Sequence, residues 1–379
     1  MRYFGTSSQA VTRWLTGCVV VALAACSGAP KKPDPKPLLP IASVMPAHVA
    51  WKHNVGKVDF PLSVAAQGDL LALADSEGSV HVLRADTGQA VWQVSAGAPL
   101  SAALGFDGRF AAAVTASGDV IGLQSSGVLW RQPLGIQAQT APLVAGERVF
   151  VLASDRSVHA FDAQNGRKLW SLKRQGDPLT LLHPGLLRAF GDTLVVGQGS
   201  RMLGLNPLSG DVLWEASLAS PRGTNEIERL ADLVSPSARV GDLICARSFQ
   251  VAVGCVNAAR ATLAWNKNFG GFLGVAADAN RVYAADASDR ISAWTLSNGA
   301  AVWSTDALLN HGLSAPAVSG KILVFGDERG MVLLLSKDDG RAMARFETDG
   351  SAIIGAPVVS GSTVVVVTRK GGVFALQPD

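Results

Sequence analysis

The chain has 379 residues, of which 48% are hydrophobic and only 17% are charged, with 40 glycines. This composition excludes an intrinsically disordered protein and indicates a chain rich in core and in turns. The formal net charge is +3, and no basic run is longer than Lys31–Lys32, which argues against a nucleic-acid-binding protein.

The N-terminus has the features of a lipoprotein signal peptide, residues 1–25. Arg2 and Arg13 precede an apolar run, LTGCVVVALAA, that is too short to span a bilayer and suits a signal-peptide core. The run ends in Leu-Ala-Ala-Cys, which resembles a bacterial lipobox and predicts cleavage before Cys26 and lipidation of Cys26. The alternative is an ordinary cleavage site beside an incidental cysteine. Because Ser27 rather than Asp follows, we expect a lipid-anchored protein of the outer membrane, facing the periplasm.

Residues 26–47 form a predicted tether between this anchor and a folded body. Its five prolines, at positions 30, 33, 35, 37 and 40, favour an extended, semi-rigid segment. We expect no secondary structure in the tether, which would lift the body away from the membrane.

One short motif, SGDVLW at residues 209–214, recurs in variants roughly every 40 residues. Two further motifs keep the same spacing: a turn before an apolar strand, as in GDLLALA (68–74), and an alternating strand, as in GSVHVL (78–83). Units of ~40–45 residues with four strands have the size of propeller blades. The sequence therefore predicts an all-β fold, an eight-bladed β-propeller of four-stranded antiparallel blades over residues 48–379.

The tryptophan that ends the motif is predicted to lie on the outermost strand of each blade and to lock it to a neighbouring blade. An indole is large enough to fill such a gap. A sugar or quinone site is the alternative, but residues that occur once per blade are spread around a ring and do not converge. The predicted blade-locking residues are Trp51, Trp92, Trp130, Trp170, Trp214, Trp265 and Trp303; the eighth position holds Ala344.

The ring is expected to close through a strand from the N-terminal part of the chain. The segment His48–Val55 carries Trp51 but belongs to no complete unit, whereas the last unit ends after GGVFAL (371–376). Pairing the two in one sheet would complete the eighth blade and remove exposed sheet edges.

Two cysteines remain once Cys18 has left with the leader and Cys26 has taken lipid. Cys245 and Cys255 lie on two predicted strands of one hairpin. In an oxidising periplasm they could form a disulfide, and the alternative is a pair of buried free thiols. No spacing of cysteines matches a zinc site.

No motif of a known catalytic class is present: the sequence lacks HExxH, GxSxG and GxxxxGK[ST]. Asp75, Asp155, Asp289 and Asp327 fall in turns between inner strands, with arginines such as Arg156 beside them. We interpret these acids as turn-forming residues that pair with the neighbouring arginines, not as acid–base or metal groups. No catalytic residue, metal site or cofactor is predicted.

Two segments depart from the repeat and are therefore candidates for function. Residues 177–187 contain five leucines, and residues 219–235 combine charged side chains with Ile227, Leu230 and Leu233. These apolar groups either cover the core of the propeller or face a partner. An apolar patch rimmed by charge is typical of a partner surface.

These features together resemble the outer membrane protein assembly factor BamB family, lipoproteins with an eight-bladed propeller of pyrroloquinoline-quinone-type repeats. The most specific resemblance is the segment NEIERLAD, residues 225–232. The resemblance implies a non-enzymatic scaffold that binds the BamA-like central barrel subunit of the β-barrel assembly machine. Such a scaffold assists the folding and insertion of outer-membrane β-barrel proteins, and unfolded outer-membrane proteins are further expected partners.

The resemblance also implies a partner surface, which this chain matches in part. The family uses a Leu-x-Leu-Arg run, matched by Leu179 and Leu181 but with Leu182 at the Arg position, and an Asp-x-Asp pair, matched by Asp232 but with Val234 as the second residue. We therefore expect a contact that is more apolar than that of the family. The predicted partner-binding residues are Leu179, Leu181, Leu182, Asn225, Glu226, Arg229 and Asp232.

Two other functions use the same architecture. One is a quinone-dependent dehydrogenase, although such enzymes are longer and carry calcium-binding side chains that are not visible here. The other is a lipid-anchored propeller that binds peptidoglycan or a different envelope protein.

Overall fold

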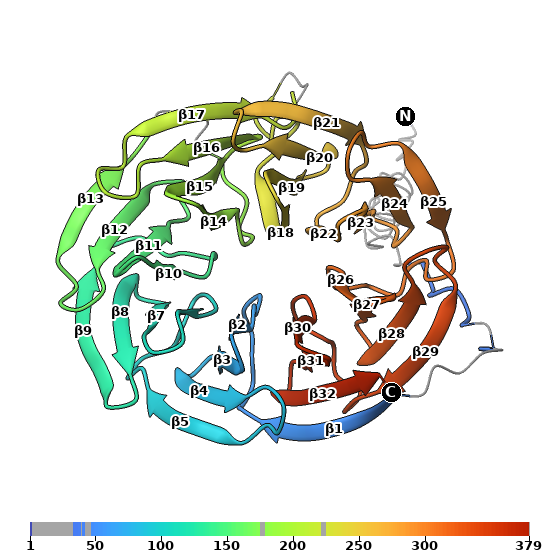
Figure 1. The fold of residues 1–379 in the computed structure, drawn as a ribbon, viewed down its shortest axis with the longest axis horizontal. Helices are drawn as coiled ribbons and strands as arrows, with labels where there is room; N and C mark the ends of the chain where they lie inside the picture. Colours follow the sequence, from blue (N-terminus) through green and yellow to red (C-terminus); the bar gives the residue numbers. More distant parts are fainter. Residues whose placement is uncertain (2–32, 39, 42–46, 175–178, 221–224, 379) are drawn as a thin grey trace. The chain divides into compact units, whose positions relative to one another are not determined.

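The computed structural model describes Met1 and residues 33–38, 40–41, 47–174, 179–220 and 225–378. Within these residues, 32 β-strands form eight four-stranded antiparallel sheets that are arranged as blades around a ring (Figure 1). The predicted eight-bladed β-propeller is confirmed. The signal peptide and Cys26 lie outside the described residues. In the part of the chain that is described, no helix is long and apolar enough to cross a membrane.

The blades follow one another along the chain, and they are numbered 1 to 8 in that order. Blades 1 to 4 consist of β2 (Ala65–Gln67), β3 (Leu70–Ala74), β4 (Ser79–Arg84) and β5 (Ala90–Ser95); β6 (Gly105–Phe106), β7 (Ala111–Val114), β8 (Asp119–Gln124) and β9 (Gly127–Pro133); β10 (Leu143–Ala145), β11 (Arg148–Leu152), β12 (Val158–Asp162) and β13 (Lys168–Leu172); and β14 (Leu187–Phe190), β15 (Thr193–Gln198), β16 (Arg201–Leu205) and β17 (Val212–Ser217). Blades 5 to 8 consist of β18 (Leu233–Val240), β19 (Leu243–Ser248), β20 (Ala252–Asn257) and β21 (Thr262–Asn268); β22 (Ala276–Ala277), β23 (Arg281–Ala285), β24 (Ile291–Thr295) and β25 (Ala301–Thr305); β26 (Ala317–Ser319), β27 (Ile322–Gly326), β28 (Met331–Ser336) and β29 (Ala342–Glu347); and β30 (Val358–Ser360), β31 (Thr363–Val367), β32 (Gly372–Pro378) and β1 (Ala47–Asn54).

The two middle strands of a blade are buried on both faces, because neighbouring blades cover them. This explains their near-continuous apolar sequences, such as LLALA in β3 and TVVVV in β31, which are buried almost throughout. The outermost strands alternate instead: β5 is exposed at every second position, since only one of its faces meets a neighbour. The core therefore lies between blades rather than in one central layer.

The antiparallel order of strands gives the ring two different faces. The segments that connect one blade to the next, and the turns between second and third strands, lie on one face, called here the connector face. The remaining turns, such as that between β14 and β15, lie on the opposite face. The distinction matters below, because it determines which residues can reach the same partner.

The ring closes as expected. β1 pairs antiparallel with β32, so the eighth blade has the order β1-β32-β31-β30 and joins strands from the two ends of the sequence. Ala47 lies opposite Pro378, and Asn54 lies opposite Gly372. Because Gly372 follows the turn between the second and third strands, β1 begins at the opposite face and ends at the connector face.

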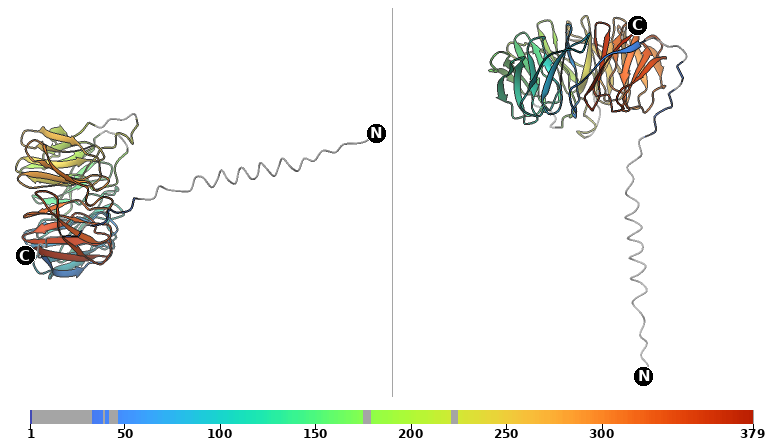
Figure 2. Two further views of the ribbon diagram at one scale, coloured as in Figure 1. Left: turned by 90° about the vertical axis from the view of Figure 1, so that its right-hand side faces the viewer. Right: turned by 90° about the horizontal axis from the view of Figure 1, so that it is seen from below.

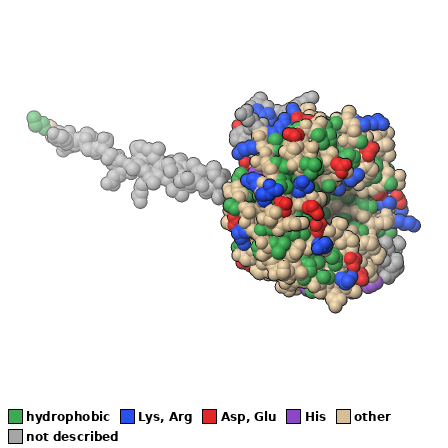
Figure 3. All heavy atoms as spheres, turned by 60° about the vertical axis from the view of Figure 1, so that its left-hand side comes forward, with side chains coloured by type: hydrophobic (Ala, Val, Ile, Leu, Met, Phe, Trp, Pro, Cys, Tyr) green, Lys and Arg blue, Asp and Glu red, His purple; other side chains and the backbone are tan. Residues whose placement is uncertain are grey.

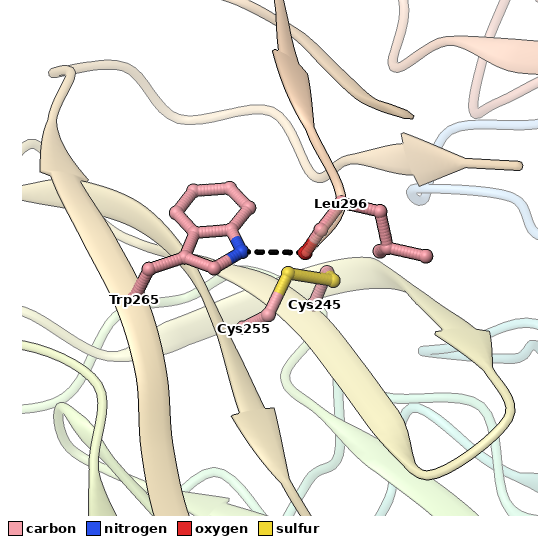
Figure 4. Close-up of a disulfide and its surroundings, with 4 residues drawn as sticks. All are labelled: Cys245, Cys255, Trp265 and Leu296. Atoms are coloured by element: carbon pink, nitrogen blue, oxygen red, sulfur yellow. Dashed lines mark hydrogen bonds between the residues drawn. A yellow bond between two sulfur atoms is a disulfide. The ribbon is translucent and has the colours of Figure 1, made fainter. Parts of the chain in front are cut away.

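Five of the seven repeated tryptophans make the same contact with the following blade. Each indole N–H donates to a backbone carbonyl in the turn between the third and fourth strands of that blade, and a glycine with positive φ three residues further on lies against the ring. Figure 4 shows this bond between Trp265 and Leu296. A Cβ atom on Gly299 would come within 2.5 Å of the Trp265 ring, so only glycine fits there. The bonds are Trp51 to Ala85 (3.0 Å), Trp130 to Ala163 (2.7 Å), Trp170 to Pro207 (3.0 Å), Trp265 to Leu296 (2.7 Å) and Trp303 to Lys337 (3.0 Å).

The three remaining positions of the motif depart from this indole lock for reasons that lie in the following turn. Within the described residues, Trp92 and Trp214 donate no such bond. In the blade after Trp92, the turn between the third and fourth strands is a tight hairpin in which Gln124 pairs with Gly127. In the blade after Trp214, the same turn has Ala261 at the glycine position. Ala344 precedes a blade whose third and fourth strands are not linked by a turn at all, so no indole could be locked there.

A disulfide joins Cys245 of β19 to Cys255 of β20, directly opposite each other in blade 5. Both cysteines are fully buried, in a cluster that contains Trp265 of the same blade and Leu296 of the following blade (Figure 4). The cross-link therefore lies behind one of the indole locks rather than at the surface.

Candidate partner-binding surface

Two connectors on the connector face depart from the repeat. Connector 3–4 is residues 173–186, between β13 and β14, and connector 4–5 is residues 218–232, between β17 and β18. Segments of both project beyond the sheets on this face of the ring (Figure 2). All seven residues expected to bind a partner lie on these two connectors, which are neighbours in space.

The Asp232 carboxylate joins the two connectors. It accepts hydrogen bonds from Arg156 Nε (2.8 Å) and Nη2 (3.0 Å) and from the backbone N–H of Leu181 (3.2 Å). Arg156 Nη2 also donates to the carbonyl of Leu179 (3.0 Å). This set of contacts, called here the Asp232 hub, therefore ties connector 4–5 to connector 3–4 through a charge-assisted, two-point ion pair.

The partner of Arg156 differs from the one expected from the sequence. Asp155, its neighbour, pairs with Lys173 instead (2.9 Å), whereas Arg156 reaches 76 residues along the chain to Asp232. Arg156 has a left-handed backbone, with φ of 64°, and Gln198 Nε2 donates to its carbonyl at 2.6 Å. The turn thus aims Arg156 at the connectors. No local sequence signal indicates a partner so far away.

Other turn acids also behave as structural residues. Asp75 and Asp327 each accept a backbone N–H within their own turn, from Ser79 (2.7 Å) and Met331 (2.8 Å). Asp289 differs, because it accepts the N–H groups of Gly312 and Leu313 in the next connector rather than one within its own turn.

Backbone contacts fix the bases of the two connectors. Ser235 N–H donates to the Pro184 carbonyl (2.8 Å), Gly185 forms an isolated bridge with Val234, and Gly185 N–H donates to Thr140 Oγ1 (2.8 Å). Because these bonds span blades 3 to 5, the connectors leave the ring from a rigid platform. A small cavity of about 40 Å³ lies between them beside His183, whose pKa is lowered by burial.

The apolar side chains of the connectors divide between the core and the solvent. Leu186 and Val234 are each 1% exposed and belong to the core, whereas Leu179 (36%), Leu182 (73%) and Ile227 (76%) are exposed. Some apolar residues of these segments thus cover the core, as one interpretation expects, and others are exposed and able to face a partner, as the other expects. The position of the family's second acid, Val234, is interior in this chain, and the position of its arginine, Leu182, is exposed.

A capped turn presents the tip of connector 4–5. The Asn225 side chain accepts the N–H of Glu228 (2.9 Å), and the Asn225 carbonyl accepts the N–H of Arg229 (3.2 Å). Asparagine is well suited to this capping role. The turn holds Glu226 and Ile227 in solvent. The segment NEIERLAD thus serves two purposes: Asn225 and Asp232 position it, and Glu226 and Ile227 form its exposed surface.

The centre of the ring contains a cavity of about 460 Å³. Apolar side chains dominate its lining, among them Phe60, Leu143, Leu187 and Ile353, with Arg369 as one of its few charged groups. Figure 3 shows a hollow at the centre of the ring and an interspersed pattern of acidic and basic side chains on the face in view. Among the described residues, no three His, Cys, Asp or Glu side chains gather closely enough to hold a metal ion.

Comparison with known proteins places the chain in a family. A family model described as outer membrane protein assembly factor BamB matches residues 76–305 and 302–379. The chain belongs to the BamB family. The outer membrane protein assembly factor BamB of Burkholderia pseudomallei is 35% identical to it over 95% of this chain and 96% of the relative.

Solved structures agree on the fold. The crystal structure of BamB from Moraxella catarrhalis superimposes with a TM-score of 0.79 at 20% identity, covering 87% of this chain and 99% of that one. A quinohemoprotein alcohol dehydrogenase from Comamonas testosteroni gives a TM-score of 0.67 at 12% identity, over 89% and 77% of the two chains. At such low identities these likenesses show a shared propeller architecture and nothing about activity.

Proposed function

We propose that this protein is a non-enzymatic scaffold of the β-barrel assembly machinery, anchored in the outer membrane through lipidated Cys26. It binds the central barrel subunit and assists the folding and insertion of outer-membrane β-barrel proteins. Membership of the BamB family supports the assembly role. In this proposal, residues 1–25 are cleaved, residues 26–47 form the tether and residues 48–379 form the docking body.

The observation that carries the binding role is the pair of connectors joined at the Asp232 hub. Leu179, Leu182 and Ile227 place apolar groups in solvent on a platform that is fixed by hydrogen bonds at its base. Exposed apolar side chains held rigidly and surrounded by polar groups are the usual centre of a protein–protein contact. Asp232 itself acts from within, because its carboxylate is occupied by Arg156 and Leu181.

The test is affinity purification of the lipidated protein in mild detergent, followed by identification of the proteins that remain bound. Leu182→Glu should sharply reduce recovery of the barrel subunit, because it places a charge on the proposed contact. Leu208→Glu is the matched control: Leu208 is similarly exposed (63%) but lies in a turn between third and fourth strands, on the opposite face. Equal recovery with both variants would contradict the assigned surface, and absence of the barrel subunit from the wild-type sample would contradict the function.

A further inference from the structure

The end of the proline-rich tether is bound to the propeller. Lys36 N–H donates to the Leu309 carbonyl (2.9 Å), and the Lys36 carbonyl accepts a hydrogen bond from His311 Nε2 (2.8 Å). Lys36 Nζ pairs with Asp306 (2.8 Å), and Leu38 packs against the apolar cluster between blades 6 and 7. Both backbone groups of one residue are thus used, together with two side chains.

The loop that binds Lys36 is fixed by contacts that do not involve the tether. It belongs to connector 6–7, residues 306–316, between β25 and β26. Asp289 accepts the N–H groups of Gly312 (2.7 Å) and Leu313 (3.1 Å), and His311 Nδ1 lies 3.3 Å from the carboxylate of Asp327. His311 is 3% exposed and Asp327 is 1% exposed, so the groups that bind Lys36 are part of the rigid interior of the loop.

The sequence of the tether suits such a site. Lys36 stands between Pro35 and Pro37, which have no N–H to donate and restrict the chain to extended conformations. A segment that is already extended loses little conformational entropy when it binds. The prolines therefore do more than lengthen the tether: they present the two backbone groups of Lys36 to the loop.

We propose that Lys36–Leu38 acts as a clamp that holds the tether against the propeller. Because of this clamp, the tether leaves the propeller from the connector face, which also carries the candidate partner surface. Connector 6–7 lies on the same face as connectors 3–4 and 4–5. Without the clamp, the first fixed point of the tether would be Ala47, the start of β1, which lies at the opposite face beside Pro378. The clamp thus reverses the face from which the body is held.

The clamp also halves the free length of the tether. Ten residues separate Cys26 from Lys36, and a fully extended chain of that length reaches about 35 Å. The corresponding segment from Cys26 to Ala47 is about twice as long. Given the lipid anchor of the proposed function, on which this orientation rests, the clamp keeps the connector face turned toward the membrane that contains the proposed partner.

Hydrogen exchange of the soluble mature chain, with Cys26→Ser, tests the clamp itself. The Lys36 amide should exchange slowly in this protein and at least tenfold faster in the His311→Ala variant, with His48→Ala, at an exposed histidine, as the control. Because His311 is buried, its removal disturbs the loop as well, so Asp306→Ala provides a second variant: Asp306 is 54% exposed, and its removal breaks only the ion pair with Lys36 Nζ. It should also speed exchange of the Lys36 amide, by less than His311→Ala. Rapid exchange of Lys36 in the parent protein would overturn the clamp.

Energy transfer to a lipid-headgroup dye tests the orientation. The full lipidated protein in phospholipid vesicles is labelled at Leu182→Cys or at Asp192→Cys, exposed positions of the same part of the ring on the connector face and the opposite face. Transfer should be clearly stronger from position 182, and Lys36→Pro should abolish or reverse the difference. Equal transfer from both positions in the parent would overturn the orientation.

The two measurements separate failure of this proposal from failure of the proposed function. A protein that does not bind vesicles would defeat the lipid anchor and the orientation with it, while slow exchange at Lys36 would still support the clamp. Recovery of the barrel subunit with a protein that shows equal transfer from the two labels would leave the scaffold function standing and contradict the orientation.

Discussion

The interfaces between blades 5 and 6 and between blades 4 and 5 come from the same repeat but are held together differently. At the first, Trp265 is locked onto Gly299, and the buried Arg247 donates to four backbone carbonyls, three in connector 5–6 (residues 269–275) and one in blade 6. At the second, Ala261 takes the place of the glycine, Trp214 is half-buried, and the connectors with the Asp232 hub lie across the junction.

The difference shows that stabilising contacts and exposed apolar surface are separate in most of the ring and are combined at one junction. Buried, repeated contacts hold most blades and leave nothing to offer a partner. At the junction of blades 4 and 5, where the indole lock is relaxed, the long connector 4–5 supplies contacts between blades and also places Ile227 in solvent. The two roles are thus combined at one side of the ring, and each can be tested there separately.

The largest effect is expected at the closing seam. Deleting residues 48–54 removes β1, one of four strands of blade 8, together with the Trp51 lock to blade 1. The third strand of blade 8 then becomes an exposed edge, and cooperative unfolding of the whole domain should be lost or shifted far downward in temperature. Thermal unfolding followed by circular dichroism measures this, with deletion of residues 27–32 of the tether as control. An unchanged melting curve would contradict closure through this strand.

The comparison of the two interfaces predicts unequal costs for their tryptophans. Trp265→Ala removes a nearly buried indole with a satisfied N–H and should lower the free energy of unfolding by about 3–5 kcal/mol. Trp214→Ala should cost clearly less, since this indole is half-buried and donates no such bond to the next blade within the described residues. Urea unfolding of the two variants measures the difference. Equal losses would mean that the hydrogen-bonded lock contributes little beyond buried area.

The Asp232 hub should contribute a coupling energy of its own. In a double-mutant cycle with Arg156→Met and Asp232→Asn, we expect about 1–2 kcal/mol of coupling, because both side chains are at most 20% exposed and share two hydrogen bonds. The exposed pair Arg84–Asp69 is the matched control and should give at most about 0.5 kcal/mol. Coupling as weak as that of the control would remove the hub as a fixing element of the connectors.

Acid should weaken the blades through buried histidines. Burial lowers the pKa of His159 to about 4, from an ordinary value near 6.5, and also lowers the pKa of His81. In the folded protein these rings therefore stay neutral at pH values at which the unfolded chain protonates them. The stability that the neutral rings contribute is complete above pH 6.5 and is lost as the pH falls toward 4. His159→Gln should flatten this loss, measured as melting temperature against pH, whereas His48→Gln, at an exposed position, should not. An identical pH dependence in His159→Gln would exclude a role for this ring.

The sequence predicts the ring well because its signals are local. Turn glycines, alternating strands and the repeated tryptophan are set within each unit, and even the missing eighth tryptophan agrees with a blade that lacks the relevant turn. The hub and the clamp were not predictable in this way. Arg156 meets Asp232 across 76 residues and His311 meets Lys36 across 275, and such pairs depend on the curvature of the whole ring rather than on any local pattern.

The smallest predicted effect converts the relaxed interface toward the locked one. Ala261 has φ of 55°, a conformation in which a Cβ atom costs roughly 1 kcal/mol, so Ala261→Gly should stabilise the protein by about 0.5–1 kcal/mol. The matched reversal, Gly299→Ala, should destabilise it, since its Cβ would meet the Trp265 ring. If Trp214 also moves into the vacated space, its fluorescence should shift to the blue. A gain in stability with unchanged fluorescence would show that the turn alone, and not the indole, responds to the substitution.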